Sequence, residues 1–186
     1  IPILAEESGK SGPLDDYFWV VDPLDGTSNF LRNIPISCVS ISLMQGLTPC
    51  LGAIFDFNNS DLYYAHKESK AYVNNMEISV SSLNLKKEST LVTGIPARDN
   101  YSDQEFKDMI SDFQSWKKIR MIGSAAMASV YVASGKAEAY KENGIFLWDI
   151  AAGAAIVEAA GGKSSISNLQ PDFRVDASFT NKNLEK

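Results

Sequence analysis

The sequence predicts a layered α/β fold, and two patterns support this prediction. The first half of the chain contains short apolar runs separated by turn signals, and the second half alternates strand-like runs with helical segments. With 186 residues and 45% hydrophobic content, the chain is long enough to bury roughly 70% of its unfolded surface. We therefore expect a single domain over residues 1–186, with an antiparallel sheet lobe at about 1–88, an α/β lobe at about 89–186, and the site between the two lobes.

The strand-like runs of the first half favour an antiparallel meander. Turn signals rich in Asn and Gly at residues 45–46, 58–59 and 74–75 separate neighbouring runs. In one run Val39, Ile41 and Leu43 alternate with other residues, which places them on one face of a strand. The expected strands cover residues 1–5, 18–21, 37–44, 50–57, 61–66 and 71–73.

The second half predicts three helices between short strands. Residues 102–105 read SDQE, a capping box that predicts the start of a helix. This helix has an apolar stripe that we expect to be part of the core: Phe106, Met109, Ile110, Phe113 and Trp116. The other helices are expected at residues 124–134 and 148–160, and strands at 91–93, 119–122 and 137–140. Asp149 suits an N-cap, and the Gly161-Gly162 pair suits a helix end.

The most informative segment, residues 18–27, reads FWVVDPLDGT. Its apolar strand ends at Asp22. In the following turn, Pro23 restricts the backbone, and Gly26 has no side chain to keep a ligand away from the backbone. Asp22, Asp25 and the Leu24 carbonyl could together bind Mg²⁺, which prefers oxygen ligands. The N–H groups of residues 26–28 could face an anion if a helical turn begins there. The alternative is an ordinary surface turn.

Two further carboxylates follow apolar segments in the same way. Glu6 comes directly after the run at residues 1–5, and Asp149 begins an almost entirely apolar helix. Taken alone, the adjacent Glu6 and Glu7 would be solvated and Asp149 would be an N-cap. Three element ends that each carry a carboxylate favour a shared metal site.

These segments resemble the signatures of the inositol monophosphatase family of Mg²⁺-dependent, lithium-sensitive phosphatases. The matching blocks lie in order over essentially the whole chain: EES at 6–8, DPLDGTSNF at 22–30, GSAA at 123–126, ENG at 142–144, and WD at 148–149 with EAAGG at 158–162. The resemblance implies a sandwich of alternating helix and sheet layers. Family members carry a helical segment upstream of the EES block, so we expect an N-terminally truncated chain with the first helical layer missing.

The resemblance also implies the site residues. The implied ligands for two or three Mg²⁺ ions are Glu6, Asp22, the Leu24 carbonyl, Asp25 and Asp149. Gly26 and Thr27 would hold the phosphate, while Glu6 and the Thr27 hydroxyl would orient the attacking water. Ala125, through its backbone, and Glu142 would contact hydroxyl groups of the substrate.

The implied function is hydrolysis of an inositol or sugar/polyol phosphate by a metal-activated water. Adenosine 3′,5′-bisphosphate, fructose 1,6-bisphosphate and histidinol phosphate are alternative substrates within the family. Arg98 would either bind a second anionic group of the substrate or lie on the surface without a role in binding. Because the upstream segment supplies an acidic partner to Thr27 in the family, one hypothesis is that the chain by itself is inactive.

Two other classes of function are alternatives to this one. Haloacid dehalogenase phosphatases also carry a pair of aspartates directly after a strand. Their two aspartates lie two residues apart, whereas Asp22 and Asp25 lie three apart. The other alternative is a catalytically silent metal-binding scaffold or interaction subunit, which the missing segment motivates.

Composition restricts the partners and the compartment. The net charge of −6 argues against nucleic acid, and no apolar run reaches transmembrane length. Cys38 and Cys50 are expected to be reduced core thiols, which favours the cytoplasm. His66, the only histidine, is expected to be a strand residue rather than a catalyst. The family resemblance implies a homodimer.

Overall fold

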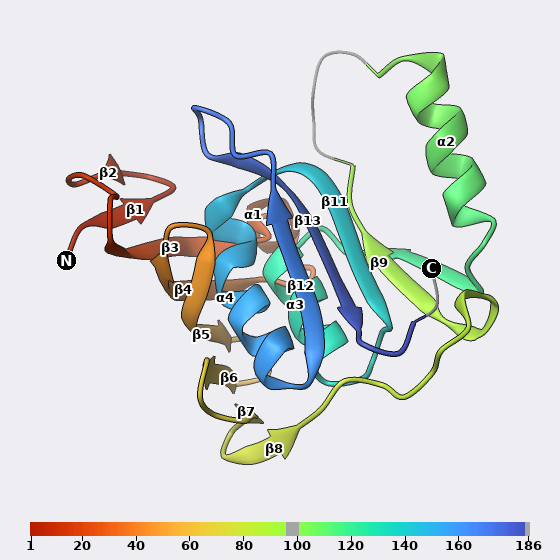
Figure 1. Cartoon of the computed structure of the whole chain (residues 1–186), viewed down its shortest axis with the longest axis horizontal. Helices are drawn as coiled ribbons and strands as arrows, with labels where there is room; N and C mark the ends of the chain where they lie inside the picture. The colour runs from red at the N-terminus through yellow and green to blue at the C-terminus, as the bar shows by residue number, and fades with distance from the viewer. Residues whose placement is uncertain (96–100, 185–186) are drawn as a thin grey trace.

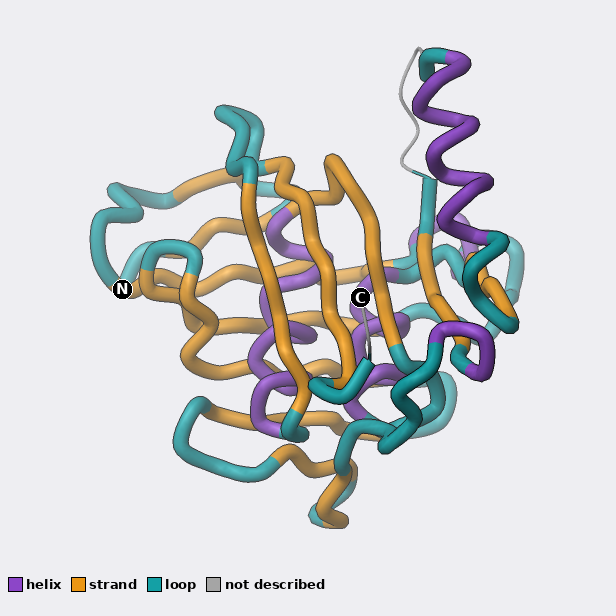
Figure 2. The backbone as a smooth tube through the Cα atoms, turned by 45° about the vertical axis from the view of Figure 1, so that its right-hand side comes forward, coloured by secondary structure: helices purple, strands orange, loops and turns teal. Residues whose placement is uncertain are grey.

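The protein is a sandwich of two β-sheets with helices between them (Figures 1 and 2). The computed structural model describes residues 1–95 and 101–184. Helices α3 (Ala125–Ala133) and α4 (Leu147–Ala159) form the middle layer. Helix α4 contacts β4, β5 and β6 in one sheet and β12 and β13 in the other. The predicted layered α/β fold is confirmed.

The first sheet has eight strands in the order β2-β1-β3-β4-β5-β6-β7-β8. Every neighbouring pair is antiparallel except β1 and β3, which run parallel with Ala5 opposite Val21. The parallel pair brings the ends of both strands to one edge, where the Glu6 N–H donates to the Val21 carbonyl at 3.3 Å. The strands are β1 (Ile3–Ala5), β2 (Gly9–Lys10), β3 (Tyr17–Asp25), β4 (Cys38–Gln45), β5 (Thr48–Asp56), β6 (Asp61–His66), β7 (Ala71–Val73) and β8 (Met76–Ile78).

The second sheet has five strands in the order β10-β9-β11-β13-β12. Strand β9 runs parallel to β10 and β11, whereas β13 is antiparallel to both of its neighbours. The strands are β9 (Thr90–Thr93), β10 (Lys118–Met121), β11 (Ala139–Phe146), β12 (Gly162–Ser167) and β13 (Arg174–Asn181). Of the strands in the two sheets, β2, β8, β12 and β13 were not predicted.

Small residues let α4 approach the first sheet closely. Ser40 and Ser42 face the interior, and the Ser40 hydroxyl donates to the Trp148 carbonyl at 3.3 Å. A Cβ at Gly52 would overlap the Ala152 carbonyl and lie 2.9 Å from its carbon. The apolar set Val39, Ile41 and Leu43 shares one face as predicted, and this is the outer face of the sheet.

Replacing Gly52 by Ala is expected to destabilise the fold strongly. The added methyl meets α4 backbone, which cannot turn aside as a side chain could, so we expect a loss of roughly 3 kcal/mol or more. Urea unfolding measures this loss. Gly12→Ala is the matched control, because its nearest contact would be an ordinary 3.6 Å. Equal midpoints for the two variants would contradict close packing of α4 on β5.

The outer face of the eight-stranded sheet exposes apolar side chains. Ile41, Phe55 and Leu62 are 37%, 42% and 40% exposed, respectively. Of the longer helices in the described ranges, α3 and α4 lie on the inner face and α2 lies beside the second sheet (Figure 1).

Helix α2 (Asp103–Phe113) has the predicted capping box but not the predicted burial. The Ser102 hydroxyl accepts from the Glu105 N–H at 3.2 Å, and the Glu105 carboxylate accepts from the Ser102 N–H at 2.8 Å. The expectation that its stripe is core was wrong, since Phe106 and Ile110 are 41% and 50% exposed. Figure 1 shows α2 standing beside the edge of the second sheet rather than across its face.

Contacts near the end of α2 fix it to the body of the protein. The Asp112 carboxylate lies 3.6 Å from the Lys141 ammonium on β11 and 3.9 Å from that of Lys86 in the 3₁₀ turn Lys86–Glu88. The periodicity identified the helix correctly, but an amphipathic stripe does not show how much of it is covered. No helix in the described ranges is both long and apolar enough to cross a membrane.

Candidate active site

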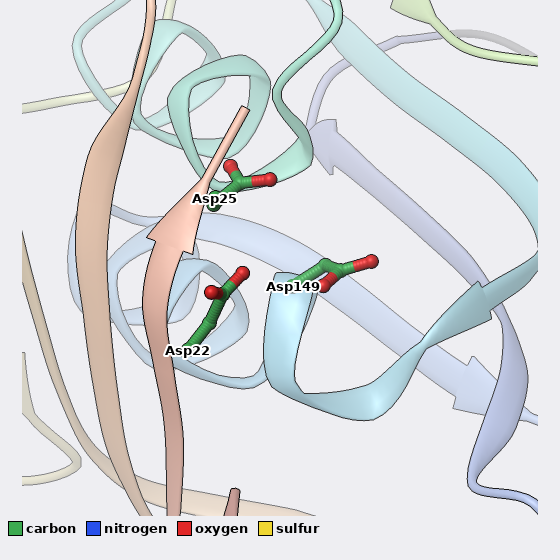
Figure 3. Close-up of side chains that lie close together, drawn as sticks. All are labelled: Asp22, Asp25 and Asp149. Carbon is green, nitrogen blue, oxygen red and sulfur yellow. The ribbon is translucent and has the colours of Figure 1, made fainter. Parts of the chain in front are cut away.

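Three carboxylates converge where β3 ends and α4 begins (Figure 3). Asp22, Asp25 and Asp149 each offer one oxygen, and these oxygens all lie within 4.8 Å of one another. Asp22 and Asp25 are buried, and Asp149 is partly buried. The structure therefore brings together three of the acidic residues that the sequence singled out.

An irregularity in β3 aims both of its aspartates at the same place. Asp22 pairs with Ser40 and Asp25 pairs with Cys38, so three steps along β3 match two along β4. In a regular strand a spacing of three would put the side chains on opposite faces, and the extra residue reverses the second one. The Leu24 N–H donates to the Asp22 carboxylate at 2.9 Å, which fixes the turn.

The start of α3 holds the Asp25 carboxylate. One oxygen, Oδ2, accepts from the Ser124 hydroxyl at 2.5 Å and from the Ala126 N–H at 2.9 Å. The Cys38 thiol donates to the same oxygen at 3.8 Å. Ser124 is also the N-cap of α3, because its hydroxyl accepts from the Met127 N–H. These donors fix the orientation of Asp25 with no cationic side chain among them.

Asp149 lies in the first turn of α4 and is not its N-cap, which was the alternative for this residue taken alone. Phe146 occupies the N-cap, and its ring stacks on Trp148 with centroids 4.6 Å apart. From its place inside the helix, Asp149 brings one carboxylate oxygen within 4.8 Å of those of the two aspartates of β3. A negative charge there is also favoured by the helix dipole.

The three carboxyl groups of the cluster have pKa values above those of ordinary aspartates. Burial, and then the charge of Asp25, raise the pKa of Asp22 to about 7. Burial also raises the pKa of Asp25 and Asp149, and for Asp149 the charges of both other aspartates add to the effect. Three buried carboxylates can ionise together only with a compensating cation. A donor set of carboxylate oxygens fits a hard divalent cation such as Mg²⁺.

Glu6 lies beside this cluster rather than within the tight group of three. It follows β1 and is exposed, yet its charge and a side-chain hydrogen bond contribute to raising the pKa of Asp22. The Leu24 carbonyl, also predicted as a ligand, accepts from the Thr27 hydroxyl at 2.8 Å. Both residues are thus close to the position that the resemblance implied.

A helical turn begins directly after the aspartates, which is the condition for the N–H groups there to face an anion. Helix α1 (Thr27–Phe30) follows Gly26, whose φ of 83° suits glycine and whose Cβ would lie 2.7 Å from the Ile36 carbonyl oxygen. Sequence reasoning missed the role of Asn29. Its amide donates to the Ile36 and Ile122 carbonyls at 2.9 and 2.7 Å, which ties α1 to the loop before α3.

The two predicted hydroxyl-contacting residues lie on the neighbouring elements. Ala125 begins α3 and is buried, and Glu142 lies on β11. Burial raises the pKa of Glu142 to about 7, and the charge of Asp25 adds to the effect. Glu142 lines a pocket of about 320 Å³ that also includes Gly94 and α2 residues such as Met109 and Phe113. Arg98 lies outside the described residues.

The fold and the site together define a layered α/β protein with a buried carboxylate cluster suited to a divalent cation. The inositol monophosphatase family model matches residues 1–183. The chain belongs to the inositol monophosphatase family.

Individual relatives agree with this membership. The chain is 39% identical over 171 residues to an inositol-1-monophosphatase of Synechocystis, covering 91% of this chain and 60% of that protein. It is 40% identical over 161 residues to a Nus factor SuhB of Xylella fastidiosa, covering 86% and 58%. A solved inositol monophosphatase from Anabaena superposes with a TM-score of 0.85 at 35% identity, covering 98% of this chain and 74% of that one. The chain thus spans about 60% of the length of these curated relatives.

Proposed function

We propose that the protein is a Mg²⁺-dependent phosphomonoesterase acting on an inositol or sugar/polyol phosphate. The observation that carries the proposal is the cluster of Asp22, Asp25 and Asp149, which lies next to the turn that opens α1. The ligands proposed for two or three Mg²⁺ ions are Glu6, Asp22, the Leu24 carbonyl, Asp25 and Asp149. Bound Mg²⁺ would supply a Lewis acid and a nucleophile at neutral pH.

The chain's own residues would bind the phosphate and orient the attacking water. Gly26 and Thr27 offer N–H groups at the start of α1, where an anion is favoured. The Thr27 hydroxyl donates a hydrogen bond to the Leu24 carbonyl, so its lone pairs remain to accept a hydrogen bond from the attacking water. Glu6, exposed beside Asp22, would accept a second one.

The alcohol part of the substrate would lie between the start of α3 and β11. The Ala125 backbone and the Glu142 carboxylate would bind its hydroxyl groups, and the name of the Synechocystis relative supports an inositol phosphate. Adenosine 3′,5′-bisphosphate, fructose 1,6-bisphosphate and histidinol phosphate remain candidate substrates for the same centre.

The test is inorganic phosphate release from these four substrates, with and without Mg²⁺ and with Li⁺ added. The proposal expects Mg²⁺-dependent, Li⁺-inhibited hydrolysis of inositol 1-phosphate or a related polyol phosphate. Metal binding without phosphate release from any substrate would favour an interaction subunit instead. That second candidate is supported by the Xylella relative, which is named a Nus factor.

We also propose a cytoplasmic homodimer. Two free, buried cysteines support a reducing compartment. Exposed apolar side chains around α1 support self-association, since Phe30, Leu31 and Ile34 are 49%, 73% and 41% exposed. Light scattering tests the assembly, and a monomer at micromolar concentration would contradict it.

Ser124→Ala is expected to weaken Mg²⁺ binding by roughly 10- to 100-fold, because Asp25 loses the hydroxyl that orients it. Isothermal titration with Mg²⁺ measures the change. Ser129→Ala is the matched control: it removes another buried hydroxyl of α3, one that donates to the Ala125 carbonyl. Equal Mg²⁺ affinities in the two variants would show that Ser124 does not support the metal site.

A further inference from the structure

The Glu142 carboxylate contacts two residues for which no role has been assigned. The Tyr140 hydroxyl donates to Glu142 Oε2 at 3.0 Å. Gly94, which directly follows β9, lies against the same carboxylate: a Cβ there would overlap Oε2 and come within 2.6 Å of Oε1. The carboxylate is therefore restricted both by a donor and by close packing.

Tyr140 is well placed to orient the Glu142 carboxylate. The two residues are two apart on β11, so their side chains share a face of the sheet. The Tyr140 side chain is 1% exposed, and its ring packs on Phe179 with centroids 5.5 Å apart. A ring fixed in this way leaves its hydroxyl little freedom to choose another partner.

We propose that Tyr140 is a positioning residue that aims the Glu142 carboxylate at the hydroxyl groups of the substrate, with Gly94 leaving the space this orientation requires. The inference rests on the proposed function, because it assumes that Glu142 binds the alcohol part of a phosphomonoester. Burial and the charge of Glu142 raise the pKa of Tyr140 well above its ordinary value, so the hydroxyl stays a donor.

A purely structural role for Tyr140 makes a different prediction. A tyrosine that only fills the core would affect every substrate equally when changed, through stability or through the whole site. A positioning residue affects the substrates whose hydroxyl groups Glu142 must bind, and it does so mainly in KM. Two phosphate esters with different leaving groups distinguish these roles.

The experiment compares the wild-type protein and Tyr140→Phe on inositol 1-phosphate and p-nitrophenyl phosphate, whose leaving group carries no alcohol hydroxyls. We expect KM for inositol 1-phosphate to rise roughly tenfold, as for the loss of one charge-assisted hydrogen bond. KM for p-nitrophenyl phosphate is expected to change less than twofold. Tyr131→Phe, which removes a half-buried hydroxyl on α3, is the matched control and is expected to change neither value.

Two further variants strengthen the comparison. In a Glu142→Ala background, Tyr140→Phe is expected to have no additional effect on inositol 1-phosphate. Gly94→Ala should displace the carboxylate by steric overlap and raise the same KM, and it provides the test if Tyr140→Phe does not fold. Equal effects of Tyr140→Phe on both substrates, or no effect on either, would overturn the positioning role while leaving the proposed function in place. A wild-type protein that hydrolyses neither these esters nor any substrate of the panel above would overturn the proposed function and this inference with it.

Discussion

Asp22→Asn is expected to abolish Mg²⁺-dependent phosphate release while leaving the fold intact. The substitution keeps the shape of the side chain but removes a charge from the centre of the carboxylate cluster. A metal ion supplies several kcal/mol of transition-state stabilisation, and each 1.36 kcal/mol is tenfold in rate, so we expect a loss of about a thousandfold or more.

The same substitution should make the metal-free protein more stable. Asp22 is 1% exposed and its pKa is raised by burial, so as a carboxylate it is held in an unfavourable place unless a cation is bound. A neutral amide at this position would relieve the repulsion, and the melting temperature should no longer depend on Mg²⁺. Asp16→Asn, which changes an exposed aspartate just before β3, is the control and should alter neither property. Retained activity in pure Asp22→Asn protein would overturn the assignment of the site.

The carboxylate cluster could be predicted from sequence because each acid directly follows or begins an apolar element. The expectation that the strand ends at Asp22 was wrong, because β3 continues through Pro23 to Asp25 and Asp22 is buried within it. Pro23 nevertheless signalled an interruption of regular strand pairing. The structure turns that interruption into the irregularity that aligns Asp22 with Asp25. Local chemistry was sufficient here, because the residues that define the turn are neighbours in sequence.

Features that depend on distant contacts could not be predicted in this way. Strand β12 reads GKSSIS and lies at a sheet edge, so its polar composition gives little strand signal. The stripe of α2 looked like core because periodicity records amphipathicity but not coverage. Asn29 and Ser124 are polar residues whose partners lie 93 and 99 positions away, and nothing local identifies such pairs.

The metal-free protein is expected to lose stability as the pH rises from about 5 to 8. Asp22 and Glu142 have their pKa raised to about 7 in the folded protein, whereas in the unfolded chain they titrate near 3.8 and 4.5. Between these values the folded state binds more protons than the unfolded state, so stability falls with increasing pH. The contribution is fully present below the unfolded values and is lost as the pH passes through about 7.

Mg²⁺ is expected to reverse this trend, because a bound cation replaces the protons that the cluster loses. At pH 8 and a concentration a hundred times its dissociation constant, Mg²⁺ should stabilise the fold by about 2.7 kcal/mol, which corresponds to roughly 5–10 °C in melting temperature. At pH 5 the shift should be much smaller, because protons compete for the same oxygens. Melting curves across this pH range, with NaCl matched in ionic strength as the control, measure both effects. A shift of equal size at pH 5 and pH 8, or one that NaCl reproduces, would contradict binding at the carboxylate cluster.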